Sequence, residues 1–409
     1  MGGIVVMRCC WKRDTASSGR LRVTDINKTE LSTTEAVQPV PASSRRKFLT
    51  GAAVTAAGAT AALAAPNISR AQTVALKMQG AWSPTDIFND MAMEYVDRVN
   101  EMAGGRLQIE YLVGGAVVKP FSVQDAVNEG ILDAGHHVTV YWYGKHKAAS
   151  LFGTGPVWGW NAHQGLAWIH KGGGQELYNE LISDILGLNL VGFFAMPMPT
   201  QPLGWFSNPI ESAADLNGLK YRTVGLAADV FNEMGVAVTQ LPGGEIVPAL
   251  ERGVIDAFEF NNPTSDMRFG AQDVRKIYMM GSYHQATEYF EIIFNKAKYD
   301  SLPAEHQAIL KYAAEAASTS NFATGLDNYS SDLVKLEEGG VQIVRTPQDV
   351  MNAQLDAWDK VLEGLMQDEY FAKVVESQKE WCKRVVRYEL FNSADYKLAY
   401  EHYYGPIGF

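Results

Sequence analysis

Arg222 and Glu259 are the two side chains whose types and positions point to binding chemistry. Arg222 lies at the start of a predicted strand, and Glu259 lies at the end of another, with a helix-like run of residues 245–252 between them. An arginine holds a permanent charge on a planar fork that suits a carboxylate. A glutamate can bind a hard metal ion or a substrate hydroxyl. Since ligands of α/β domains bind beyond the carboxyl ends of parallel strands, we expect these two residues to line one site.

The elements before this pair alternate between strand and helix patterns. Residues 74–79 and 107–112 alternate in polarity as strands do, and residues 86–101 carry an apolar stripe at helical spacing. Gly104 and Gly105 end the helix and turn the chain. This order predicts an α/β fold with a mostly parallel sheet covered by helices.

One short phrase occurs twice in the chain. Residues 128–134 read NEGILDA and residues 251–257 read ERGVIDA, 123 positions later. In each copy a helical run ends at glycine, and the apolar pair after it is predicted to begin a short strand that ends in Asp-Ala. The repeat favours two similar α/β units that face each other across a ligand cleft and close by hinge motion.

The first 71 residues are predicted to be an export leader rather than part of the fold. Residues 44–49 read SRRKFL, a twin-arginine signature, and an apolar run of small residues follows from Gly51 to Ala65. Ser69-Arg70-Ala71 is a suitable cleavage site. The apolar run is shorter than the ~20 residues that span a bilayer, so a secretory signal is favoured over a membrane anchor.

Composition bounds the remaining 338 residues. The leader holds ten Lys/Arg and four Asp/Glu, so a total charge of −11 leaves about −17 on the rest of the chain. Such an acidic protein is a poor partner for nucleic acid or an anionic membrane surface. Cys9 and Cys10 fall in the leader, and Cys382 alone cannot form an internal disulfide. The length suits two lobes rather than one.

Three further phrases carry a resemblance to a known family. They are LNGLKYR at 216–222, LERGVIDA at 250–257 and FNKAKYDSLP at 294–303. In order and spacing they resemble the solute-binding subunits of tripartite ATP-independent periplasmic (TRAP) transporters, over essentially all of the chain after the leader. The resemblance implies a periplasmic protein with a two-lobed binding-protein-like α/β fold, long connecting helices and a cleft that closes on an organic anion. It also implies that Arg222 pairs with the ligand carboxylate.

Within that family, the chain is similar to the branch that binds 2-oxo or 2-hydroxy monocarboxylates with a cation such as Na⁺ or Ca²⁺. The segment MPTQPLGWF at 198–206 matches the one whose glutamine binds both substrate and metal, which is Gln201 here. Residues 257–260 match the segment that supplies a glutamate side chain, Glu259, and the backbone carbonyl of the next residue, Phe260. Phe260 stands where tryptophan is usual, which leaves the carbonyl in place but changes the pocket shape.

The resemblance also implies how the lobes divide. Lobe I is predicted over residues 72–198, completed by about 286–330, and lobe II over residues 199–285, completed by about 331–409. In this branch the extended C-terminal region can exchange between subunits of a dimer. A homodimer and packing of the C-terminal helices across the chain's own lobes are both open. Residues 283–288 precede a predicted strand near the hinge, and whether they reach the ligand is also open.

Two classes of function follow from these patterns. The first is a binding protein that captures a small 2-oxo or 2-hydroxy monocarboxylate with a cation and delivers it to TRAP membrane subunits. The second is an exported enzyme acting on a small organic acid, although the chain lacks a G-x-S-x-G nucleophile motif and a G-x-G-x-x-G phosphate loop. A ligand-sensing adaptor on the same fold is a third alternative.

Overall fold

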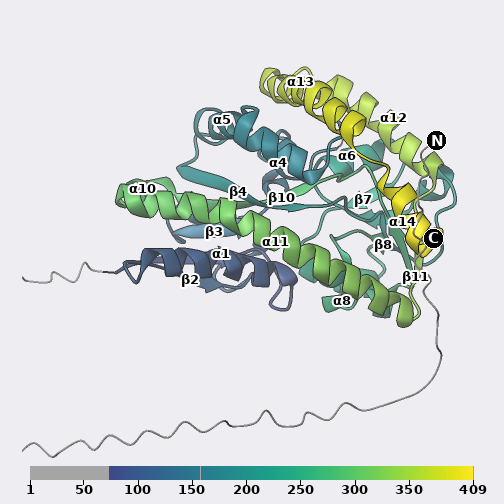
Figure 1. Cartoon of the computed structure of the whole chain (residues 1–409), viewed down its shortest axis with the longest axis horizontal. Coiled ribbons are helices and arrows are strands. Elements are labelled where there is room, and N and C mark those ends of the chain that lie inside the picture. The colour runs from purple at the N-terminus through teal and green to yellow at the C-terminus, as the bar shows by residue number, and fades with distance from the viewer. Residues whose placement is uncertain (1–72, 157, 409) are drawn as a thin grey trace, which may run out of the picture. The chain divides into compact units, whose positions relative to one another are not determined.

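The computed structural model describes residues 73–156 and 158–408. The predicted leader, residues 1–71, lies outside the described residues. Within the described residues the chain forms two β-sheets with helices packed around them (Figure 1). The predicted α/β class is therefore confirmed. None of the described helices combines the length and the apolar character needed to cross a membrane.

The first sheet has five strands in the order β2-β1-β3-β10-β4. Its strands β2, β1 and β3 run parallel, and β10 runs antiparallel to both of its neighbours. The bounds are β1 Val74–Gly80, β2 Leu107–Leu112, β3 Ala134–His137, β4 Leu190–Met198 and β10 Glu288–Asn295.

The second sheet repeats this plan. Its order is β11-β9-β5-β8-β6-β7; β7, β6 and β8 run parallel, and β5 runs antiparallel to β8 and β9. The bounds are β5 Gly204–Phe206, β6 Lys220–Arg222, β7 Ala237–Thr239, β8 Ala257–Phe258, β9 Ile277–Met280 and β11 Gln342–Arg345. From the outer strand inward, β7-β6-β8-β5-β9 matches β2-β1-β3-β10-β4 in order and direction.

The internal repeat falls on equivalent elements of the two sheets. Each copy joins a helix, α2 (Val123–Asn128) or α7 (Ile246–Glu251), to the third strand of its sheet, β3 or β8. The strands begin at Ala134 and Ala257, so the prediction that they end there was wrong. The preceding apolar residues instead close the helix ends, where backbone N–H groups of Ile131 and Val254 bond back to helix carbonyls at 2.9 Å.

The helices cover the sheets and connect them. Their bounds, besides α2 and α7, are α1 Ile87–Ala103, α3 Ala149–Gly153, α4 Ala162–Lys171, α5 Gly174–Glu180, α6 Leu226–Glu233, α8 Pro263–Arg268, α9 Ala271–Val274, α10 Lys296–Asp300, α11 Ala304–Glu338, α12 Gln348–Leu365, α13 Glu369–Asn392 and α14 Tyr396–Tyr404. The 35-residue α11 packs on α1 and β4 and also contacts α8 near its other end (Figure 1). It therefore runs along both halves of the fold.

The chain crosses between the two sheets three times. Residues 199–203 lead from β4 to β5, residues 281–287 lead from β9 to β10, and α11 leads toward β11. The first two crossings lie against each other, because the N–H of Gln201 donates to the carbonyl of Gln285 at 3.1 Å. The predicted division into lobes near residues 198 and 285 stays a prediction.

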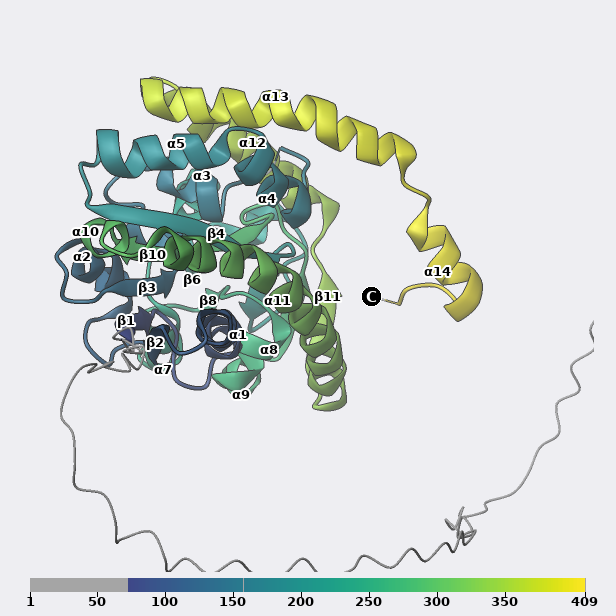
Figure 2. The ribbon, with the colours of Figure 1, turned by 60° about the vertical axis from the view of Figure 1, so that its left-hand side comes forward.

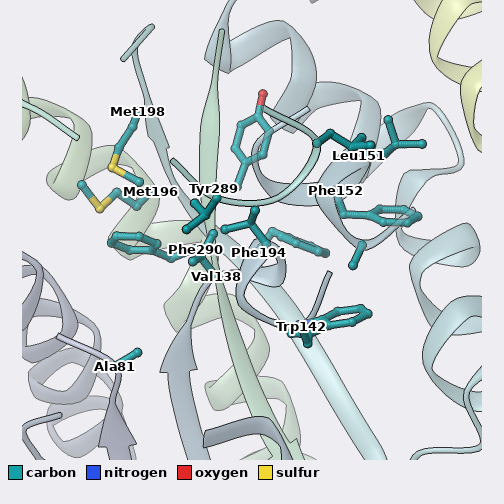
Figure 3. Close-up of a cluster of buried hydrophobic side chains, with 14 of the residues drawn as sticks. Ala81, Val138, Trp142, Leu151, Phe152, Phe194, Met196, Met198, Tyr289 and Phe290 are labelled. Atoms are coloured by element: carbon teal, nitrogen blue, oxygen red, sulfur yellow. The ribbon is translucent and has the colours of Figure 1, made fainter. Parts of the chain in front are cut away.

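Strand β10 is buried along its whole length because helices cover both faces of the first sheet. Ile292 and Phe294 belong to the cluster formed with α1 and α11, whereas Ile293 belongs to the cluster on the opposite face. On that opposite face, Tyr289 gathers with Phe152 and Phe194 (Figure 3), whereas Phe290 packs against Phe88 of α1 with ring centroids 4.7 Å apart. This core holds the start of β10 rigidly beside the crossing segments.

The last helix leaves the body of the protein. Helix α13 packs on α4 and α5, but its last turns are exposed, with Leu390 at 77 % and Phe391 at 94 %. Helix α14 follows with no buried residue, and Figure 2 shows it standing away from the rest of the chain. The C-terminal arm, residues 390–408, is thus an unpacked extension in a single copy of the chain.

Substitution of Gly204 tests how closely the second sheet packs beside Glu259. A Cβ atom at this position would lie 2.1 Å from the carbonyl oxygen of Phe258, and φ is +124°. We expect Gly204→Ala to lower the free energy of unfolding by at least about 3 kcal/mol, since backbone strain and overpacking add. Gly340→Ala is the matched control, because φ is +83° but no atom lies within 4 Å; it should cost about 1 kcal/mol. Equal losses in guanidinium unfolding would contradict this packing.

Candidate binding site

Arg222 and Glu259 meet at the carboxyl ends of adjacent parallel strands. Arg222 is the last residue of β6, so its predicted place at the start of a strand was wrong. Because β6 and β8 pair with Arg222 opposite Phe258, Glu259 follows one step further along the same edge. Nη1 of Arg222 lies 3.0 Å from Oε1 of Glu259, and the two side chains are 1 % and 0 % exposed. The sequence prediction that they share a site is consistent with this geometry.

The guanidinium of Arg222 is held on three sides. Nη1 also donates to the backbone carbonyl of Glu259 at 2.8 Å, and Nε donates to the carbonyl of Leu241 at 2.8 Å. The ring of Phe260 lies over the guanidinium, 5.6 Å from Cζ to the ring centroid. This arrangement favours a fixed orientation of the charge. Among the described residues, Nη2 has no hydrogen-bond partner.

Gln201 joins the site through Glu288, the first residue of β10. Nε2 of Gln201 donates to Oε2 of Glu288 at 2.9 Å, and Nδ2 of Asn261 donates to the same oxygen. The charges of Glu259 and Arg222 both act on the Glu288 carboxyl, so the two groups of side chains lie near each other. The sequence pointed to Glu288 only as part of residues 283–288, and Asn261 was not predicted.

Three buried oxygens of this site lack a partner among the described residues. They are Oε1 of Gln201, Oε2 of Glu259 and the hydroxyl of Thr223, which lies beside Glu259. A buried acceptor without a hydrogen bond costs about 1–3 kcal/mol, so such atoms commonly mark an ion, a water or a ligand. Gln201 and Glu259 are the two predicted to bind a cation, and amide and carboxylate oxygens are the donors that hard cations prefer. The residues present therefore fit a Na⁺ or Ca²⁺ ion.

A cavity of about 210 Å³ borders Phe260 and Tyr141. Its walls come from both halves of the fold, with Trp82 and Tyr141 from the first-sheet side and Phe260 and residues 242–245 from the second-sheet side. The charges of Arg222, Glu288 and Glu259 act on the Tyr141 hydroxyl, so this side chain lies close to those three residues. The cavity thus offers an apolar space beside a polar site.

Burial raises the pKa of four carboxyl groups around the site. The pKa of Glu288 is raised to about 8 by burial, although hydrogen bonds from Asn261 and Gln201 oppose the shift. Burial raises the pKa of Glu259 to about 7 in spite of the charge on Arg222. Asp86 and Asp266 are likewise raised to about 7 by burial. Groups with such shifts commonly cluster at functional sites.

These shifts predict how the stability of the ligand-free protein depends on pH. Each carboxyl binds protons more tightly folded than unfolded, so its contribution is fully present below the ordinary pKa of about 4 and is lost as pH rises through 7–8. We expect the guanidinium unfolding midpoint to fall between pH 7 and pH 9. Over most of that window the buried histidines His136, His137 and His284, whose pKa values burial lowers, are neutral in the folded state and largely neutral in the unfolded state.

Glu288→Gln is the matched variant for this measurement. It removes the group with the highest of the four pKa values, so the fall between pH 7 and pH 9 should become shallower. Glu305→Gln, on an exposed pair with Arg106, is the control and should leave the slope unchanged. A midpoint that rises over this pH range in wild-type protein would contradict the assignment.

A family model matches most of the described chain. Residues 78–372 match DctP, described as bacterial extracellular solute-binding protein, family 7. The match includes all four predicted site residues and every strand except the first four residues of β1. It ends before the exposed C-terminal arm.

Individual relatives agree with that match. A monocarboxylate 2-oxoacid-binding periplasmic protein of Nostoc sp. is 32 % identical and covers 86 % of this chain and 98 % of its own length. A TRAP transporter solute-binding protein from Bordetella bronchiseptica, a mixed-occupancy dimer with calcium and picolinate, is 29 % identical with a TM-score of 0.75, over 81 % of this chain and 97 % of the other. One from Pseudoalteromonas atlantica with sodium and pyruvate is 30 % identical with a TM-score of 0.74, over 81 % and 99 %.

Proposed function

Because the chain belongs to the DctP family of bacterial extracellular solute-binding proteins, family 7, we propose that it captures a small 2-oxo or 2-hydroxy monocarboxylate together with a metal cation. It then delivers the acid to TRAP membrane subunits. The family resemblance and the two-lobed α/β fold predicted from sequence are confirmed. The family and its structural neighbours are solute receptors, so the chain is a binding protein and the enzyme alternative is set aside.

The observation that most supports this proposal is the pair of unpartnered oxygens beside a fixed arginine. Oε1 of Gln201 and Oε2 of Glu259, with the backbone carbonyl of Phe260, would supply oxygen ligands for the cation. Arg222 uses Nε and Nη1 within the protein, which leaves Nη2 for the ligand carboxylate. The acid's carboxylate and 2-oxygen would complete the cation's ligands, so that no buried charge would stay unpaired.

A bound cation would supply a positive charge that attracts the acid. The relatives support either ion, since the Pseudoalteromonas protein holds sodium with pyruvate and the Bordetella protein holds calcium with picolinate. The cavity beside Phe260 and Tyr141 receives the rest of the acid. Phenylalanine at 260, in place of the usual tryptophan, gives that cavity its shape.

Contacts between the two halves support closure around the ligand. Ser265 of α8 donates to Asp86, the N-cap of α1, at 2.9 Å. On the other side of the cleft, Lys147 lies 3.1 Å from Asp229 of α6. Asp86 and Lys147 belong to the first-sheet half, and Ser265 and Asp229 to the second. Hinge motion at the crossing segments would open these contacts and release the acid.

Export places the protein where such a receptor works. The family is extracytoplasmic. We also propose that the protein is exported by the twin-arginine route. The sequence signature at residues 44–49 supports this, and those residues lie outside the part that the structure describes.

The binding roles can be tested by thermal shift and calorimetry with pyruvate. Pyruvate should raise the melting temperature only when Na⁺ or Ca²⁺ is present, because a ligand of the native state stabilises it. Arg222→Lys keeps the charge but loses the planar fork, so pyruvate affinity should fall about 10- to 100-fold. Glu259→Gln should raise the cation concentration needed for binding. Lys360→Ala, in an exposed pair with Glu233, is the control.

Two results would reject the proposed function. One is pyruvate binding that survives exhaustive chelation and desalting unchanged. The other is conversion of pyruvate or a related acid into product by the purified protein.

We also propose that the C-terminal arm joins two copies of the chain. Tyr396, Tyr400 and Tyr404 lie at i, i+4 and i+8 of α14 and are exposed by 49–76 %. A groove of about 610 Å³ runs beside α13, lined by apolar Trp158, Val386 and residues 390–391. The Bordetella relative is a dimer, and an arm with no buried residue gains stability only when a second copy covers it.

Removing α14 tests the dimer. A chain ending at Ser393 should keep its unfolding midpoint at low protein concentration, because every residue removed from the described part is outside the core. It should sediment as a monomer where the full chain sediments as a dimer. A wild-type protein that remains monomeric at tens of micromolar would exclude this role.

A further inference from the structure

The amide of Gln201 has two ends of nearly equal shape and opposite chemistry. Its oxygen can bind a cation, whereas its NH₂ group repels one. Which end faces the site depends on the hydrogen bonds of the neighbours. Gln201 is 1 % exposed, so water does little to fix the choice.

A chain of hydrogen bonds beginning at a backbone N–H fixes that choice. The N–H of Ser265, in the first turn of α8, can only donate, and it bonds to Oδ1 of Asn262 at 2.8 Å. Nδ2 of Asn262 must therefore be its other end, and it donates to Oδ1 of Asn261 at 2.8 Å. By the same rule Nδ2 of Asn261 points onward, to Glu288.

Glu288 passes this polarity to Gln201. Its Oε2 accepts from Nδ2 of Asn261 and also from Nε2 of Gln201, the latter at 2.9 Å. Both N–H groups donate to this one oxygen, so Gln201 turns its NH₂ toward Glu288. Oε1 of Gln201 is then the end without a partner among the described residues.

We propose that Glu288, with Asn261 and Asn262, is a positioning relay that orients the Gln201 amide so that its oxygen faces the cation. This inference rests on the proposed function and assigns residues to it that touch neither the acid nor the ion. All members of the relay are buried, with 3–5 % exposure. Such supporting hydrogen bonds usually change metal affinity about 10- to 100-fold.

The relay also joins the two halves of the fold. Glu288 begins β10 of the first sheet, whereas Asn261 and Asn262 follow β8 of the second sheet. Gln201 lies on the crossing segment between them. The oxygen of Gln201 is therefore fully oriented only when the halves are together, which couples cation binding to closure.

The first test compares two substitutions of Glu288. Chelator-treated protein is held at saturating pyruvate, Ca²⁺ is titrated in, and the midpoint is read by calorimetry. Glu288→Leu should raise the midpoint about 10- to 100-fold. Glu288→Gln should stay within about threefold of wild type, because its carbonyl oxygen can accept both N–H groups. Equal loss in both variants would overturn the relay, since it would show that charge rather than orientation matters.

A second test changes the start of the relay. Asn262→Asp still accepts from the N–H of Ser265 and so keeps the cap of α8, but it has no N–H to give Asn261. Asn261 must then reverse and present its oxygen to Glu288. We expect a Ca²⁺ midpoint about tenfold higher, although the added negative charge alone would lower it. A lower or unchanged midpoint would overturn the relay.

A double-mutant cycle separates this inference from the proposed function. In a Gln201→Ala background, Glu288→Leu should cause no further loss of Ca²⁺ affinity, because its effect passes through the Gln201 amide. Fully additive losses would overturn the relay and leave the proposed function intact. Pyruvate binding by wild type with no dependence on any cation would instead reject the proposed function.

Discussion

The buried ion pair between Arg222 and Glu259 is the constraint on which the site depends. Both charges are out of water, and removing either leaves the other without compensation, which typically costs 3–5 kcal/mol. Parallel register between β6 and β8 brings the two together, and the tight packing of β5 at Gly204 holds the Glu259 backbone. Yet the pairing is incomplete, because Oε2 of Glu259 has no partner among the described residues. The site is thus built around an ion pair whose remaining unpartnered oxygen is available to a ligand.

The sequence predicted the parts of this design that local patterns encode. Alternating polarity located β1 and β2, and a helical stripe located α1 to within two residues at each end. The repeated phrase indicated two similar units, and it lies at the third strand of each sheet. Arg222 and Glu259 stood out because they offer a guanidinium and a carboxylate at strand boundaries, where α/β folds bind ligands.

Other features depend on contacts that a sequence pattern cannot show. Arg222 was assigned to the wrong end of its strand because β6 is only three residues long, too short to reveal a period. The relay through Asn261 and Asn262 joins residues 201, 261 and 288, whose side chains meet only after two sheets have assembled. Asparagines after a strand normally indicate a turn or helix cap, and Asn262 does cap α8; its second hydrogen bond gives no local signal.

The crossing segments have a consequence for how the chain reaches its native state. In each sheet the antiparallel strand directly follows a crossing segment. Strand β5 of the second sheet is made after most of the first sheet, and β10 of the first sheet is made after most of the second. The first sheet is therefore unfinished until residue 295 has been made. The first half therefore cannot mature as an independent nascent domain, and pairings this distant in sequence slow folding. An export system that threads unfolded chains would therefore take up this protein before it had folded. A system that accepts only folded cargo would act after both sheets are complete.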